Sequence, residues 1–122
     1  MRQHEERLRR LAMYDGAYLE RVLCVDGADA ETLVLDPRVR SLVRLAALIA
    51  LDAPETAFDS VTSAALANGA TADDVVDVLI TTCPVVGSAH VATAAPRVAR
   101  VLGYDVDADL ERLDIATRGT GG

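Results

Sequence analysis

Cys83 and His90 are the residues of this sequence best suited to nucleophilic chemistry. They lie seven positions apart in the segment CPVVGSAH. On one continuous helix this spacing would place the thiol and the imidazole on the same face. An imidazole beside a cysteine can stabilise the thiolate and make it a nucleophile. The simpler interpretation is a small buried thiol near a turn, with the histidine packed locally.

Asp77 is the strongest candidate for acid/base chemistry. It lies between two valines in the segment VVDVL, so an apolar surrounding is expected for its carboxyl group. A carboxyl group held between helices can exchange a proton with a bound substrate. The alternative interpretation is an exposed helix acid that balances an arginine.

Three arginines, Arg38, Arg40 and Arg44, follow Pro37 at nearly helical spacing. A guanidinium group binds a carboxylate through paired hydrogen bonds, so these side chains could hold an acidic substrate. They could equally form a solvated or ion-paired helix face.

Other reactive constellations are weak. His4 has no histidine or carboxylate partner at metal-ligand spacing, so no metal site is expected. A catalytic triad of Ser88, His90 and Asp77 can be imagined, but nothing in the spacing supports it. No cofactor is implied.

Composition excludes several classes of function. Nineteen acidic residues against twelve basic ones give a formal net charge of −7, which is the wrong sign for binding nucleic acid. All of the basic residues are arginines. The lack of lysine excludes a Schiff-base lysine and a phosphate-loop lysine.

The sequence also bears on the compartment. Two cysteines, Cys24 and Cys83, are too few for a disulfide framework. Residues 1–11 lack the apolar core of a signal peptide, and the longest apolar run, residues 45–51, is too short to span a bilayer. We therefore expect a cytoplasmic location and no membrane partner.

Apolar periodicity and helix caps then predict the elements that position these residues. Helices are expected over about residues 5–25, 37–51, 55–68, from 71 to an interruption at Pro84, 86–102 and 108–115. Asp36 before Pro37 marks a helix start, and Thr71 is expected to cap the helix that follows it. Gly69 and Gly103 are expected at helix ends.

These elements predict an all-α fold, a compact bundle of five or six helices. It would form a single domain over residues 1–117, with a disordered tail over residues 118–122. The helix over 37–51 is apolar on nearly all sides after Arg44, which is typical of a core or a subunit interface. We therefore predict an obligate homo-oligomer.

The segments LDPRVRSLVRLAALIAL and SVTSAALANGATADDVVDVLI carry a family pattern. The core ALANGAT spans residues 65–71, an acidic pair stands at Asp73 and Asp74, Asp77 is the third acidic position, and Gly87 matches a turn glycine. The chain thereby resembles the carboxymuconolactone decarboxylase-like family. That resemblance implies an all-helical fold of the alkyl hydroperoxidase D-like type.

The resemblance covers about residues 35–102, but the family's reactive positions are replaced. The family histidine falls on Val61, and the redox cysteines fall on Pro54 and Ala57. None of these side chains can exchange a proton or form a disulfide. The turn tyrosine and proline become Val85 and Ala89. The resemblance therefore favours a decarboxylase-like lyase over a Cys-x-x-Cys peroxidase.

The leading hypothesis is a lyase-type enzyme that binds a small organic acid or lactone in an apolar pocket between helices. Asp77 would act as acid/base, Arg40 or Arg44 would bind a carboxylate, and Val61 would line the pocket. The first alternative is a non-catalytic oligomeric binding or scaffold protein that kept the fold and lost the site.

A second alternative is a single-cysteine thiol peroxidase that uses Cys83 and His90. It would need a nearby resolving thiol, and Cys24 is the other cysteine of the chain.

Overall fold

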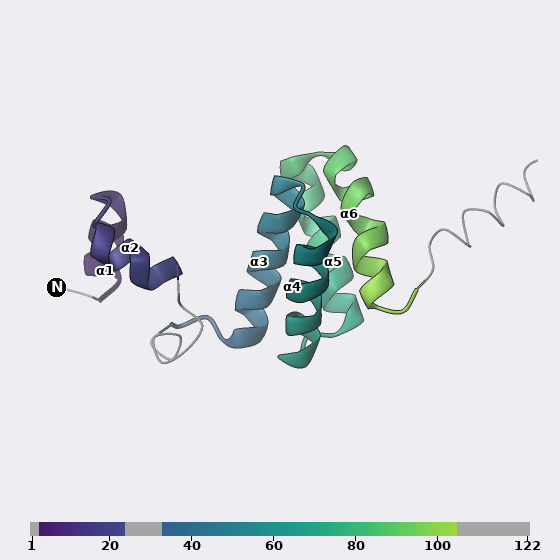
Figure 1. The fold of residues 1–122 in the computed structure, drawn as a ribbon, viewed down its shortest axis with the longest axis horizontal. Coiled ribbons are helices and arrows are strands. Elements are labelled where there is room, and N and C mark those ends of the chain that lie inside the picture. The colour runs from purple at the N-terminus through teal and green to yellow at the C-terminus, as the bar shows by residue number, and fades with distance from the viewer. Residues whose placement is uncertain (1–2, 24–32, 105–122) are drawn as a thin grey trace, which may run out of the picture. The chain divides into compact units, whose positions relative to one another are not determined.

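The computed structural model describes residues 3–23 and 33–104 (Figure 1). The chain divides into two units, Met1–Val34 and Leu35–Gly122, which are described separately. Three predictions lie outside the described residues: the helix over 108–115, the tail over 118–122 and the role of Cys24. The single domain over residues 1–117 stays a prediction.

The first unit contains two short helices, α1 (Gln3–Ala12) and α2 (Gly16–Leu23), where one helix over 5–25 was expected. That prediction was wrong because Asp15 starts a new helix. Its carboxylate accepts a hydrogen bond from the Tyr18 backbone N–H at 3.2 Å, as an N-cap does. Tyr14, with a φ of 56°, turns the chain between the two helices.

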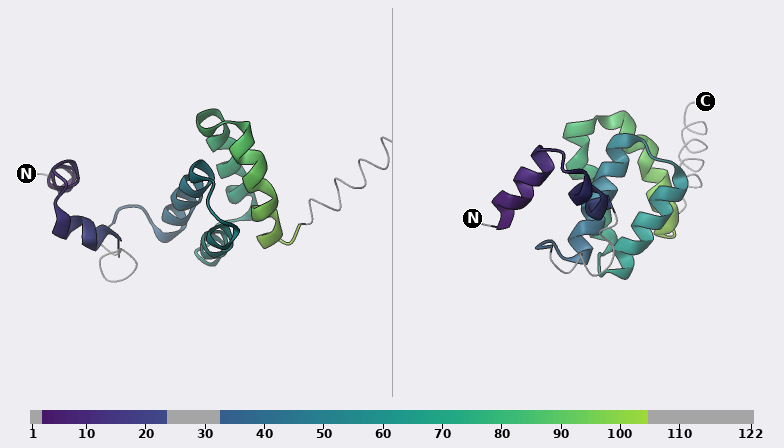
Figure 2. Two further views of the ribbon diagram at one scale, coloured as in Figure 1. Left: turned by 45° about the horizontal axis from the view of Figure 1, so that its top comes forward. Right: turned by 60° about the vertical axis from the view of Figure 1, so that its left-hand side comes forward.

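The second unit is a bundle of α3 (Pro37–Leu51), α4 (Glu55–Ala67), α5 (Ala72–Val86) and α6 (Ser88–Val101). α3 packs against α4 and α5, and α6 packs against the same two helices (Figures 1 and 2). No strand occurs in the part of the chain that the structure describes. The all-α prediction is confirmed.

The expected caps define the ends of these helices. Asp36 accepts a hydrogen bond from the Val39 N–H at 2.9 Å, directly before Pro37. Thr71 and Asp74 form a reciprocal capping box at the start of α5. Gly69, with a φ of 99°, adopts a backbone conformation that favours glycine, directly after Asn68, the C-cap residue of α4.

Pro84 does not interrupt the helix where the sequence led us to expect it. α5 continues through Pro84 to Val86 and ends at Gly87, whose φ is 92°. Proline in the last turn removes a single intrahelical hydrogen bond, the one that the Ile80 carbonyl would accept. The glycine, and not the proline, therefore separates α5 from α6.

The core of the bundle is built from small and medium apolar side chains around one aromatic ring. Phe58 of α4 is 1% exposed. The other buried members of the core cluster come from α3, α5, α6 and the connection between α3 and α4: Leu45, Ile49, Ala53, Val75, Leu79, Ala94 and Val98. The Arg97 guanidinium lies 5.7 Å from the ring centroid and donates to the Ala53 carbonyl oxygen at 2.6 Å. This contact joins α6 to the connection between α3 and α4.

One carboxylate ties the amino end of α5 to that of α3. Asp74 accepts a hydrogen bond from the Thr71 backbone N–H at 2.9 Å and pairs with Arg38 of α3 at 3.0 Å. The hydrogen bond from the Thr71 backbone, together with the Arg38 charge, lowers the pKa of Asp74 from its ordinary value of 3.8. α3 and α5 therefore begin side by side.

We expect Phe58→Ala to lower the free energy of unfolding by about 3–5 kcal/mol, because it removes the largest buried side chain and leaves a cavity. Urea unfolding followed by circular dichroism measures this change. Leu51→Ala removes a side chain that is 75% exposed and serves as the control, with an expected loss below about 0.5 kcal/mol. Equal losses in the two variants would contradict this description of the core.

We also expect Asp74→Asn to lower the melting temperature at neutral pH but not in strong acid. Because the folded-state pKa of Asp74 is lowered, its stabilising effect is complete above the ordinary value of 3.8 and is lost as the pH falls through the lowered value. Thermal melts across this range measure the gap between wild type and variant. Asp73→Asn, at the exposed neighbouring position, is the control. A gap that persists unchanged in strong acid would refute the assignment.

Candidate functional site

A groove of about 520 Å³ runs along one side of the α3–α5 pair. Both helices contribute side chains at the spacing of one helix face. The lining residues are Val39, Leu42, Val43, Ala46, Asp74, Asp77, Val78, Thr81, Thr82 and Val85. Of the predicted site residues, this groove contains Asp77.

Asp77 and Thr81 are the polar groups of the groove whose side chains are not engaged elsewhere. Both are exposed, and no hydrogen bond or ion pair joins either side chain to another described residue. They lie four residues apart on α5, so they are neighbours on one helix face. The Thr82 hydroxyl, by contrast, donates to the Val78 carbonyl oxygen one turn earlier. The groove thus presents a carboxylate and a hydroxyl side by side.

Sequence reasoning expected Asp77 in an apolar pocket between helices, but it did not select Thr81 or specify which helices line the pocket. The spacing of Thr81 from Asp77 was visible in the sequence, but nothing in the sequence shows which face of α5 meets α3. That face depends on how the helices pack, which local patterns do not specify.

The predicted carboxylate-binding arginines lie elsewhere on α3. Neither Arg40 nor Arg44 is a lining residue of the groove. Arg40 donates to the Leu35 carbonyl oxygen at 2.9 Å. The arginine that reaches the amino end of α5 is Arg38, and it pairs with Asp74.

Cys83 and His90 lie on different helices, so the shared face that one continuous helix would give them does not form. Gly87 ends α5 between them, and His90 belongs to the first turns of α6. Cys83 is a half-buried free thiol. It lies six residues after Asp77, which places the two side chains about 120° apart around the α5 axis. The structure therefore does not bring Asp77 and Cys83 to one face.

His90 has a buried ring atom without a polar contact. Its Nδ1 has no hydrogen-bond partner among the described residues, and no hydrogen bond joins its ring to Cys83. The imidazole thus lacks the positioning contact that a thiol–imidazole pair needs.

The position expected for the family histidine is part of the apolar packing. Val61 is half-buried on α4 and packs against the core, as does Ala57 one turn earlier. Val61 does not line the α3–α5 groove. Next to it, the hydroxyl of Thr62 is fully buried without a hydrogen-bond partner among the described residues.

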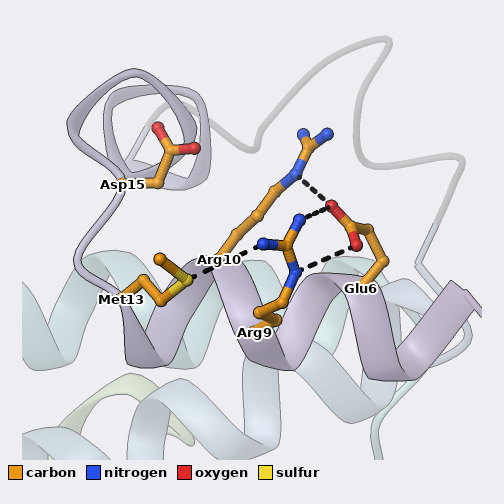
Figure 3. A pocket seen from close by; sticks show the side chains of 5 residues that line it. All are labelled: Glu6, Arg9, Arg10, Met13 and Asp15. Carbon is orange, nitrogen blue, oxygen red and sulfur yellow. Dashed lines mark hydrogen bonds and ion pairs between the residues drawn. The ribbon is translucent and has the colours of Figure 1, made fainter.

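A second pocket, of about 340 Å³, lies in the first unit (Figure 3). Glu6 accepts hydrogen bonds from Arg9 at 2.8 Å and from Arg10 at 3.0 Å, and these contacts lower the pKa of Glu6. Asp15 and Met13 complete the lining. Two acidic and two basic side chains line this pocket, so its charges balance. The pocket therefore favours neither an anionic nor a cationic ligand.

The described residues hold no group of three histidine, cysteine or carboxylate side chains that could bind a metal ion. Among the same residues, every helix is too short or too polar to cross a membrane.

Comparison with known proteins identifies the family. Searches of curated proteins and of solved structures gave no match. The sequence profile of the Carboxymuconolactone decarboxylase family matches residues 17–100, which is more than half of the chain. The resemblance seen over residues 35–102 is therefore confirmed and extends further toward the amino end. The chain belongs to the carboxymuconolactone decarboxylase family.

Proposed function

We propose that this protein is a lyase-type enzyme that acts on a small organic acid or lactone in the groove between α3 and α5, with Asp77 as acid/base. The observation that carries the proposal is the position of Asp77. Its carboxylate lines a groove with apolar walls and has no partner among the described residues. Sites of this kind, apolar with few polar groups, are typical of small-molecule binding.

In the proposed reaction Asp77 takes a proton from a carbon of the bound substrate. The electron pair of that C–H bond forms a new double bond, and the leaving group departs from the adjacent carbon with its own bonding pair. The protonated carboxyl then returns the proton to the leaving group, so Asp77 ends as it began. The side chain has to exchange one proton within hydrogen-bond reach, which an unpaired carboxylate in the groove allows.

Apolar side chains exposed around the groove support a second element of the proposal, a homo-oligomer. On α3, Val43 is 54% exposed, and on α5 the exposed fractions are 64% for Ile80 and 85% for Val85. Large apolar side chains clustered on two adjacent helices are typical of a surface that another molecule covers. A second copy of the chain would close the groove and exclude water from Asp77.

The same exposed side chains also favour the second candidate, a non-catalytic oligomeric binding protein. In that case the groove holds a ligand or a partner copy, and Asp77 transfers no proton. Turnover distinguishes the two candidates.

We expect Asp77→Asn to lower turnover about 10²–10⁴-fold, since the amide cannot exchange a proton. The assay follows consumption of a panel of small lactones and organic acids by NMR. Asp59→Asn changes an exposed carboxylate on α4 outside the groove and should keep the wild-type rate. Consumption of a panel member at the same rate by Asp77→Asn would exclude the acid/base role. A folded wild type that consumes no panel member would favour the binding protein.

We expect Ile80→Glu to shift the protein toward smaller assemblies, because a charge cannot be buried in an apolar interface without a partner. Size-exclusion chromatography with light scattering measures the molar mass. Ser63→Glu places the same charge on an exposed position of α4 and should leave the mass unchanged. A wild type that is monomeric at high concentration would refute self-association.

A further inference from the structure

The charge of the α3–α5 groove is determined by Asp77. The other acidic lining residue, Asp74, is balanced by Arg38 at 3.0 Å and accepts the Thr71 N–H. None of the lining residues is basic. A carboxylate on a ligand would therefore meet the Asp77 charge and would find no opposite charge on the groove wall.

The apolar walls strengthen this effect. Six of the lining side chains carry only carbon: Val39, Leu42, Val43, Ala46, Val78 and Val85. An ionised group that leaves water for such a surface loses its hydration and gains no compensating hydrogen bond. A ligand carboxylate beside Asp77 would also be repelled by its like charge.

The groove offers one hydrogen-bond donor that is still available. The Thr82 hydroxyl proton is engaged by the Val78 carbonyl oxygen. The Thr81 hydroxyl is exposed and donates to no described residue. A carbonyl oxygen of a ligand needs such a donor, and Thr81 lies one helical turn from Asp77.

We infer that the groove takes an uncharged carbonyl compound with an apolar body, an ester or a lactone, and disfavours the corresponding carboxylate. The Thr81 hydroxyl donates to the ligand's carbonyl oxygen, and Asp77 repels the anion. This inference rests on the proposed function only for the location of the ligand. Of the two substrate classes proposed above, it selects the uncharged one.

The test compares the affinity of methyl hexanoate with that of hexanoate at neutral pH, by ligand-observed NMR titration of the full chain. We expect the ester to bind at least about fivefold more tightly than the acid. The ester is also intrinsically more apolar, so the decisive comparison is with Asp77→Asn. In that variant we expect hexanoate to bind more tightly than it binds to the wild type, so that the ratio of ester affinity to acid affinity falls. High salt should narrow the wild-type ratio as well, because it screens the Asp77 charge.

The role of Thr81 is tested separately. Thr81→Val keeps the shape of the side chain and removes the donor, so it should weaken ester binding by about three- to tenfold. Thr93→Val makes the same change on α6, outside the groove, and should leave the ester affinity unchanged. Circular dichroism confirms that both variants are folded.

Three results would overturn the inference: no detectable ester binding, hexanoate binding as tight as the ester, or a ratio unaffected by Asp77→Asn. These results are separate from the fate of the proposed reaction. Ester selectivity without turnover would refute the lyase and keep this inference. Turnover of a free acid that depends on Asp77, together with hexanoate bound as tightly as the ester, would keep the lyase and refute this inference.

Discussion

The shared use of the Asp74 carboxylate holds the amino ends of α3 and α5 together, in addition to the packing of their buried apolar side chains. One side chain completes the capping box of α5 through Thr71 and pairs with Arg38 of α3. A carboxylate is favourable at the amino end of a helix for electrostatic reasons alone, and the arginine adds an interhelical contact to that local preference. The two helices therefore start together, and the face they share becomes the wall of the groove. Because the Asp74 carboxylate is already paired with Arg38 and Thr71, Asp77 is the acidic side chain of the groove that remains available to a ligand.

Local signals in the sequence predicted the bundle well because helix ends are determined by a few neighbouring residues. Asp36, Thr71 and Gly69 act in the structure as caps and stops in the way their types predict. The two failures have the same origin. In both places a local signal depends on its position in the helix: Asp15 caps a new helix inside the apolar periodicity of residues 5–25, and Pro84 lies in the last turn of α5, where a proline ends no helix.

The site was less predictable, because a site depends on which helix faces meet. Asp77 was selected from its place in the family pattern and lies in the groove. Arg38 and Arg40 are two residues apart, so they point to different sides of α3. The spacing alone could not show which of these two sides faces α5. The distance in sequence between Cys83 and His90 had meaning only on an unbroken helix, and Gly87 breaks it.

The groove and the core occupy different faces of the same two helices. Leu45 and Val75 are fully buried in the core, whereas Val43 and Val85 form the groove wall and are largely exposed. Among the apolar wall residues, Leu42 and Val78 pack against the core as well. Most wall positions can therefore accept substitutions without creating a cavity. The variants keep enough folding stability to stay above the threshold that limits protein evolution. A lineage carrying this bundle can alter what it binds in small steps, each one tolerated by the fold.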